Sequence, residues 1–129
     1  MDTACSRPAY AKINLHLAVG LPYPDGYHPI QSLFALVGLS DTISLVWKKS
    51  RTFAVQVHGL EAVCSGSEDT LTKAARLWHE AGGYPLQLDI RCDKQIPVKA
   101  GLGGGSSDAA ALLACCRPSI PGARFLISC

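Results

Sequence analysis

Residues 97–110 read Pro97-Val98-Lys99-Ala100-Gly101-Leu102-Gly103-Gly104-Gly105-Ser106-Ser107-Asp108-Ala109-Ala110. Four glycines in five positions leave the backbone free to adopt positive φ and to approach a ligand closely. The loop leads into residues 109–114, an alanine- and leucine-rich run that strongly favours a helix. Because a helix start presents unpaired N–H groups and a partial positive charge, this stretch predicts a phosphate-binding loop.

Two hydroxyl groups stand where this helix should begin. Ser106 and Ser107 can donate to phosphate oxygens or help to hold a phosphate-bound magnesium ion. The alternatives are a flexible linker or a capped turn without a ligand. Two familiar phosphate loops do not fit, because no lysine follows the glycines as in G-x-x-x-x-G-K-[ST], and Ser106 stands where G-x-G-x-x-G needs its third glycine. The sequence therefore predicts a third kind of phosphate loop.

The chain before this loop is predicted to be largely β-structure. Residues 86–91 alternate apolar and polar side chains, as a strand does. Residues 9–19 alternate in the same way, which predicts a half-buried strand whose polar face carries Tyr10, Lys12, Asn14 and His16. The apolar run 28–37 fits a short strand that ends before Gly38.

A hairpin and a helix complete the expected elements. Two more alternating stretches, 41–47 and 52–58, are predicted to pair as a hairpin with the basic residues 48–51 at its tip. The spacing of apolar residues becomes helical over residues 69–80. The expected caps of this helix are Asp69 or Ser67 at its start and Gly82-Gly83 at its end. Strands, helix, strand, glycine loop and helix, in this order, predict an α+β domain.

The composition is that of a globular domain. The 129 residues are 48% hydrophobic and 17% charged, which argues against disorder. No apolar run is long enough for a membrane-spanning helix, and the N-terminus lacks the apolar stretch of a secretion signal. The net charge of +2 is too balanced for a dedicated nucleic-acid binder. We therefore expect a soluble, cytoplasmic chain that binds neither nucleic acid nor membrane.

The final stretch, residues 115–129, differs in composition from the rest. It contains no acidic residue, three of the six cysteines, and both arginines that account for the net charge. Pro118 is expected to break the preceding helix. We therefore assign residues 1–114 to the domain and 115–129 to an anomalous tail. A reading-frame shift or a premature stop would produce such a tail; resequencing the locus tests this hypothesis, and an intact frame would contradict it.

The glycine loop, taken as a whole, resembles the ATP-phosphate motif of the GHMP kinases, which act on hydroxyl groups of small molecules. A second match is formed by Ala11-Lys12-Ile13-Asn14-Leu15, Asp25-Gly26-Tyr27-His28, Gln31-Ser32-Leu33-Phe34 and Asp41-Thr42-Ile43. Together they are most similar to the branch that acts on 4-diphosphocytidyl-2-C-methyl-D-erythritol, in the non-mevalonate isoprenoid pathway. The resemblance covers residues 8–114 and implies that family's N-terminal domain, a mixed or antiparallel sheet with helices on one face, without the C-terminal domain.

The resemblance implies ATP and Mg²⁺ as cofactors and phosphoryl transfer to the 2-hydroxyl of the cytidine diphosphate-linked methylerythritol. Lys12 matches the catalytic lysine, whose ammonium would stabilise a developing alkoxide and the transferring phosphoryl group. Asn14 matches a polar contact to the methylerythritol portion. Tyr27 and His28 match residues that recognise the cytosine ring, by stacking and by hydrogen bonds to its edge. From the residues alone, two ordinary interpretations remain open. Lys12 could be a solvated lysine on a strand, and Tyr27 and His28 could be a turn tyrosine with a capping histidine.

The same resemblance assigns ATP binding to Pro97, Val98, Lys99, Ala100, Gly101, Leu102, Gly103, Gly104, Gly105, Ser106 and Ser107. Residues 69–75 resemble a segment that lines the adenine pocket, although Thr70 stands where the family usually has asparagine. From its position after the serines, Asp108 is interpreted as a capping carboxylate rather than a magnesium ligand or general base. Ordinary surface or core roles are expected for His16, His58 and His79, and buried or incidental thiols for Cys5, Cys64 and Cys92.

One part of the family's machinery has no counterpart in these residues. The family's catalytic aspartate comes from a later Gly-x-Asp-x-Pro-type segment, and the 129 residues contain none. Two functions therefore stand: the kinase activity itself, or a truncated or frameshifted, non-catalytic fragment of that kinase. We expect negligible turnover from residues 1–129 alone. A third class, a dinucleotide-binding module, is disfavoured by the spelling of the loop.

Overall fold

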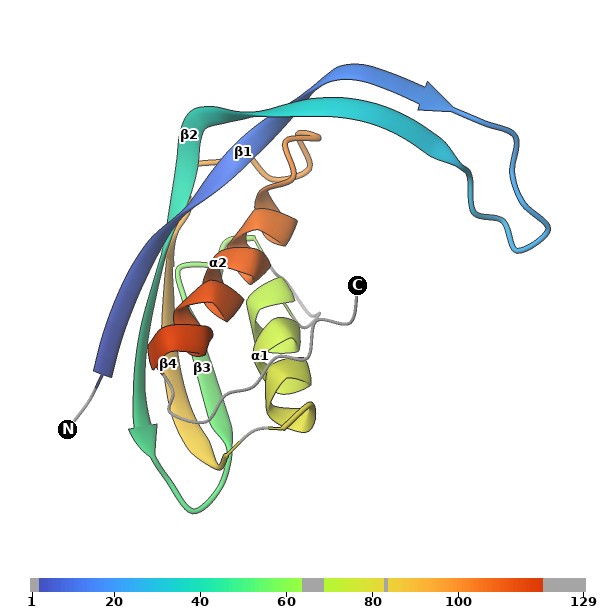
Figure 1. The fold of residues 1–129 in the computed structure, drawn as a ribbon. Helices are drawn as coiled ribbons and strands as arrows, with labels where there is room; N and C mark the ends of the chain where they lie inside the picture. The colour runs from blue at the N-terminus through green and yellow to red at the C-terminus, as the bar shows by residue number, and fades with distance from the viewer. Residues whose placement is uncertain (1–2, 64–68, 83, 120–129) are drawn as a thin grey trace.

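The computed structural model describes residues 3–63, 69–82 and 84–119. Its elements in chain order are β1 (Thr3–Val19), β2 (Ile30–Lys49), β3 (Ala54–His58), α1 (Thr70–Glu80), β4 (Leu86–Asp93) and α2 (Gly104–Ser119). The strands form one mixed sheet in the order β1-β2-β4-β3, and both helices lie on one of its faces (Figure 1). The predicted α+β class and arrangement are confirmed.

Strand β4 shows how the core is built. Its side chains alternate strictly between buried and exposed, because one face of the sheet carries the helices and the other faces solvent. The buried set, together with its partners on β2, α1 and α2, includes Leu86, Leu88, Ile90, Ile43, Leu45, Trp47, Leu71, Ala75, Trp78, Leu112, Cys115 and Cys116. The strand predicted over 86–91 and the helix predicted over 69–80 are confirmed. Asp69 caps α1 by accepting a hydrogen bond from the backbone N–H of Thr72 at 2.8 Å.

The hairpin predicted between residues 41–47 and 52–58 is wrong. β4 lies between β2 and β3, antiparallel to the first and parallel to the second. Parallel neighbours need a crossover connection, and α1 supplies it between β3 and β4. The basic segment 48–51 carries the chain past the start of β4, where the N–H of Ser50 donates to the carbonyl of Pro85 at 3.2 Å.

Strand β2 is one strand of 20 residues where the sequence suggested two. Its pairing with β1 shifts after Tyr10, which lies opposite Ser40, since Lys12 already lies opposite Leu36. Residues 37–39 of β2 therefore lie opposite the single residue Ala11, so β2 has two extra residues here and forms a bulge, which bends a strand without ending it. Gly38, expected to end the strand, lies in this bulge.

Beyond the bulge the two strands leave the helices and continue as a curved two-stranded arm, residues 13–40 (Figure 1). No residue of the arm is buried. The half-buried strand predicted over residues 9–19 is correct only as far as Ala11, because the apolar side chains from Ile13 to Val19 are 41% to 61% exposed. Both helices lie over the rest of the molecule, which we call the body, and no described element covers the arm.

Helix α2 continues to Ser119, so the break expected at Pro118 does not occur there. A proline in the last turn removes only one N–H, next to the terminal carbonyls that lack helical partners in any case. Cys115 and Cys116 are fully buried in the core, where burial raises the pKa of each thiol to about 12. The division at residue 115 stays a prediction: residues 115–119 continue α2, and residues 120–129 lie outside the described residues. No helix in the described part of the chain is long and apolar enough to cross a membrane.

Candidate functional site

The glycine loop borders a cavity of about 420 Å³ at the start of α2. Every predicted loop residue except Ser107 lines it. Its other walls are formed by Leu60, Val63, Asp69, Thr70, Leu71, Lys94 and Asp108. The loop, the start of α1 and the end of β4 therefore meet around one space.

The backbone of the loop adopts positive φ at three positions before α2 begins. Gly101 and Gly103 have φ of 74° and 70°, and Lys99 also adopts the left-handed region at 58°, which is uncommon outside glycine. The N–H of Ser107 donates to the carbonyl of Gly103 at 3.0 Å, which closes the first helical turn. The N–H groups before it have no acceptor within the helix, as at any helix start. This end of α2 can therefore receive an anion.

Lys12 of β1 is attached to the same loop by its backbone and its side chain. Its N–H donates to the carbonyl of Leu102 at 2.9 Å, and its ammonium donates to the carbonyl of Gly101 at 3.1 Å. Because β1 is an edge strand, its outward N–H groups have no neighbouring strand to pair with. The loop uses that free edge, and the ammonium of Lys12 therefore lies against Gly101, which is one of the residues that line the cavity.

Gly103 is required at the contact with Lys12. A Cβ atom on this residue would lie 3.2 Å from both Cγ and Cε of Lys12, and its φ is unfavourable for other residues. A larger side chain would push the lysine away from the loop. The sequence pattern of glycines therefore has a second use here, since it makes room for the ammonium as well as for a ligand.

The other predicted substrate residues separate into two groups. Asn14 lies beside Lys12: its Oδ1 accepts from the ammonium at 2.6 Å, and its Nδ2 donates to the hydroxyl of Ser32 at 2.9 Å. Tyr27 and His28 lie in the turn between β1 and β2, at the far end of the arm (Figure 1). Tyr27 is 76% exposed, and Nδ1 of His28 hydrogen-bonds to the carbonyl of Gly20 at 2.9 Å. The structure thus joins Lys12 and Asn14 to the loop, and holds Tyr27 and His28 apart from it.

The segment expected to line an adenine pocket also reaches the cavity. Asp69, Thr70 and Leu71, at the start of α1, are three of its lining residues. The hydroxyl of Thr70 lies 3.5 Å from where a Cβ on Gly105 would be, so α1 and the first turn of α2 are in close contact. Thr70, the one departure from the family pattern in this segment, therefore faces the loop.

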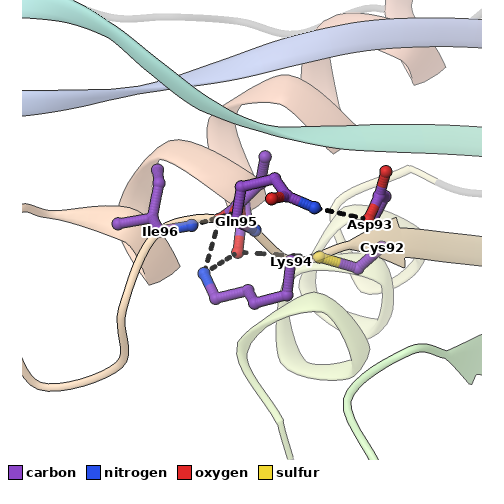
Figure 2. A network of polar contacts seen from close by, with 7 residues as sticks. Cys92, Asp93, Lys94, Gln95 and Ile96 are labelled. Atoms are coloured by element: carbon purple, nitrogen blue, oxygen red, sulfur yellow. Dashed lines mark hydrogen bonds and ion pairs between the residues drawn. The ribbon is translucent and has the colours of Figure 1, made fainter.

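A buried ion network that the sequence reading missed lies behind the loop. The ammonium of Lys94 donates to Asp41 Oδ2 at 2.5 Å and to Asp108 Oδ2 at 2.9 Å (Figure 2). Asp41 and Asp108 are 0% and 3% exposed. Asp108 is therefore no cap: it is the fifth residue of α2, one turn inside the helix, and faces the core instead of the helix end. The signal was present, because Asp41 shares the buried register of Ile43 and Leu45.

The pKa values of the two carboxyl groups in the network shift in opposite directions. Burial alone would raise the pKa of Asp41, but hydrogen bonds from the N–H of Ile96, from Lys94 and from the N–H of Gln95 outweigh it and lower that pKa. Burial dominates at Asp108 and raises its pKa to about 6. The pKa of Lys94 is raised, since its two carboxylate partners outweigh the effect of burial. Asp108 Oδ1 is buried and has no hydrogen-bond partner among the described residues.

The other predicted histidines make contacts of their own, whereas Cys92 touches the ion network, because its Sγ donates to Asp108 Oδ2 at 4.0 Å. His58 lies 3.4 Å from Asp89, and the ring of His79 stacks on Phe53 at 4.1 Å between centroids. Cys92 is a buried thiol, and burial raises its pKa to about 12. Within the described ranges no group of three or more His, Cys, Asp or Glu side chains is placed to hold a metal ion. Cys64 lies outside the described residues.

Comparison with known proteins gives matches to one protein family and to several kinases. The family described as GHMP kinases N terminal domain matches residues 69–118. A 4-diphosphocytidyl-2-C-methyl-D-erythritol kinase of Xanthomonas euvesicatoria is 42% identical over 106 residues, which are 82% of this chain and 36% of that protein. The kinase of the same name from Aromatoleum aromaticum is 42% identical over 118 residues, 88% of this chain and 41% of that protein. The chain thus spans well under half the length of the curated relatives it matches.

Two solved structures share the fold. A crystal structure of 4-(cytidine 5'-diphospho)-2C-methyl-D-erythritol kinase aligns with a TM-score of 0.75 and 38% identity, over 95% of this chain and 43% of that one. Homoserine kinase from Cytophaga hutchinsonii aligns with a TM-score of 0.63 at 16% identity, over 95% of this chain and 37% of that one. At that identity the second likeness concerns the fold alone.

Proposed function

Because residues 69–118 match the N-terminal domain of the GHMP kinases, we propose that the chain is a member of that family and that its glycine-loop cavity binds the phosphates of ATP for small-molecule phosphorylation. The observation that carries the proposal is the attachment of Lys12 to the loop, through Leu102 and Gly101. Lys12 also packs against Gly103, the residue before α2, so its cation lies close to the start of that helix. A γ-phosphoryl group held there would have positive charge on two sides.

The acceptor that we propose is the 2-hydroxyl of 4-diphosphocytidyl-2-C-methyl-D-erythritol. The activity for which the relatives are named supports this choice, and so does the pairing of Lys12 with Asn14 on one face of β1. The Lys12 ammonium would stabilise the alkoxide that forms as the hydroxyl attacks, while Asn14 would orient the polyol. Tyr27 and His28 would bind the cytosine ring, which requires an extended substrate that follows the arm away from the loop.

Magnesium fits the donor set at the loop. Mg²⁺ bound to nucleotides prefers oxygen ligands and retains several waters, so it needs few protein groups. Ser106, in the first turn of α2, lines the cavity and its hydroxyl would hold the ion, whereas Ser107 lies in the same turn but does not line the cavity. When bound, the ion would neutralise charge on the transferring phosphate. Asp108 is engaged with Lys94 and is left out of this assignment.

The proposal is tested by titrating residues 1–129 with ATP and Mg²⁺ and by following ADP release with the cytidine-linked substrate. We expect saturable ATP binding, lost or strongly weakened in Lys12→Ala, together with negligible turnover. Absence of ATP binding at millimolar nucleotide would contradict the phosphate-site assignment. An NAD titration serves as the control for nucleotide class, and we expect no response to it.

The alternative is a non-catalytic fragment of the kinase. Two observations favour this alternative. The chain spans 36% of the Xanthomonas relative, and the 129 residues contain no Gly-x-Asp-x-Pro-type segment. Both readings predict ATP binding, and the negligible turnover expected above is the result that the fragment reading predicts. Substrate-dependent ADP release by residues 1–129, abolished in Lys12→Ala, would exclude the fragment reading.

A further inference from the structure

The ion network of Asp41, Lys94 and Asp108 connects three segments of the chain at the base of the glycine loop. Asp41 belongs to β2, Lys94 follows the end of β4, and Asp108 belongs to α2. A single ammonium contacts both carboxylates, at 2.5 and 2.9 Å (Figure 2). It is 16% exposed at its side chain and lines the cavity.

The network fixes the point where the loop begins. Asp41 Oδ1 accepts hydrogen bonds from the N–H groups of Gln95 and Ile96, at 2.5 and 2.7 Å. Pro97, the first residue of the phosphate segment, follows directly. Because Asp41 is itself held in the sheet by β2, the loop starts from a backbone that is bonded to a rigid strand.

The network also fixes the point where the loop ends. Asp108 holds α2 to Lys94, and a Cβ on Gly104 would lie only 3.0 Å from the Lys94 ammonium and 3.1 Å from Cγ2 of Ile96. The first residue of α2 is therefore packed directly on the same two side chains. Both ends of the loop, eight residues apart in sequence from Ile96 to Gly104, are held around one nitrogen atom.

Stability alone is a poor reason for such a network. Burying two carboxylates with one ammonium leaves a net negative charge in the core, and apolar side chains of similar size commonly give a more stable protein. The raised pKa of Asp108 reflects the same conflict. The arrangement is better explained by what it positions, namely the N–H groups of the loop and of the first turn of α2.

We propose that Asp41, Lys94 and Asp108 form a clamp whose task is to hold the glycine loop in the geometry that receives phosphate. Lys94 is thus a positioning residue that acts through the backbone at Ile96 and Gly104. The proposal rests on the phosphate-site function proposed above for this loop. It adds that loop geometry depends on a hydrogen-bond acceptor at position 108, and not on a negative charge there.

The test compares Asp108→Ala with Asp108→Asn in residues 1–129. Asp108→Ala cuts the link to α2 but leaves Lys94 paired with Asp41, so no buried charge is left alone. Asp108→Asn keeps an acceptor for the ammonium and serves as the rescue variant. Ile90→Val, a loss of one buried methyl group from β4, is the control for general loosening of the core. Hydrogen exchange of residues 97–107 and the affinity for ATP with Mg²⁺ are the two measurements.

We expect Asp108→Ala to raise exchange across 97–107 and to weaken ATP binding by about tenfold, the value of one hydrogen bond to a charged group. Asp108→Asn should restore most of both, and Ile90→Val should leave both close to wild type. Unchanged loop exchange in Asp108→Ala, or equal loosening in Ile90→Val, would overturn the clamp. If the wild-type chain does not bind ATP while Asp108→Ala still loosens the loop selectively, the clamp stands and the proposed function fails.

Discussion

The body and the arm have the same alternation of apolar and polar residues, but their apolar side chains differ in burial. In the body, alternate residues of β4 and of the second half of β2 are fully buried beneath α1 and α2. In the arm, alternate residues such as Leu15 and Leu17 are 61% and 54% exposed. Alternation therefore determines which face of a strand is apolar, while burial depends on whether another element covers that face.

The largest expected difference comes from removing one leucine in each region. Leu88→Ala, in the body, should lower the free energy of unfolding by about 2–5 kcal/mol, because the side chain is fully buried. Leu17→Ala, in the arm, should change it by about 0.5 kcal/mol or less. Urea denaturation followed by tryptophan fluorescence measures both. Equal losses would mean that the arm is covered in solution.

Lys12, at the junction of body and arm, should matter more for binding than for folding. Lys12→Met removes the ammonium that contacts Gly101 and Asn14 and should weaken ATP binding by about tenfold. Lys48→Met is the matched control, because it also removes one lysine from a strand of the sheet. Lys48 is exposed and lies near the C-terminal end of β2. Calorimetric titration gives both affinities. A similar loss in both variants would point to general electrostatics and against a specific contact.

The raised pKa of Asp108 gives the stability of the body a pH dependence. Because the pKa of Asp108 is raised to about 6 in the folded state, the folded chain holds a proton between about pH 4 and 6 that the unfolded chain has released. This group's contribution to stability is therefore lost as pH rises through that range. Asp108→Asn should be about 1 kcal/mol more stable than wild type at pH 7, and the difference should vanish near pH 4. Thermal melts at both pH values measure it, and a difference that does not change with pH would contradict the assignment.

The smallest effect is expected at the tip of the arm. Asp25 Oδ1 accepts a hydrogen bond from the N–H of Tyr27 at 3.0 Å, a common stabilising contact in turns. Asp25→Ala should increase hydrogen exchange within residues 20–29 while changing the global free energy of unfolding by less than about 0.5 kcal/mol. A larger global effect would show that the arm folds together with the body.

Local features were predictable from the sequence. Helix α1 with its Asp69 cap, strand β4 and the glycine loop at the start of α2 all follow from spacing, propensity and turn chemistry over short stretches. The resemblance to the GHMP kinases placed Lys12 and the loop in one site, and the structure has them in contact. These predictions depend only on residues that are close in sequence, or on a motif with a characteristic geometry.

Features that depend on distant segments were not predictable in the same way. The insertion of β4 between β2 and β3 requires knowledge of the α1 crossover, because the short connection between β2 and β3 is compatible with a hairpin. Asp108 was interpreted from its immediate neighbours, although its partners Lys94 and Asp41 come from two other elements. An acidic residue in the buried register of a strand is the local signal that could have revealed this network.

The bulge at residues 37–39 has a mechanical consequence. From Lys12 to Val19 the arm extends about 23 Å, at about 3.3 Å for each residue of strand. Acting as a lever, it would carry the turn at its tip through about 2 Å for a rotation of only about 5° at the bulge. Catalytic geometry is sensitive to displacements of about 1 Å. The direction of the tip, which carries Tyr27 and His28, therefore depends on a bulge in β2 that lies far from it along the strand.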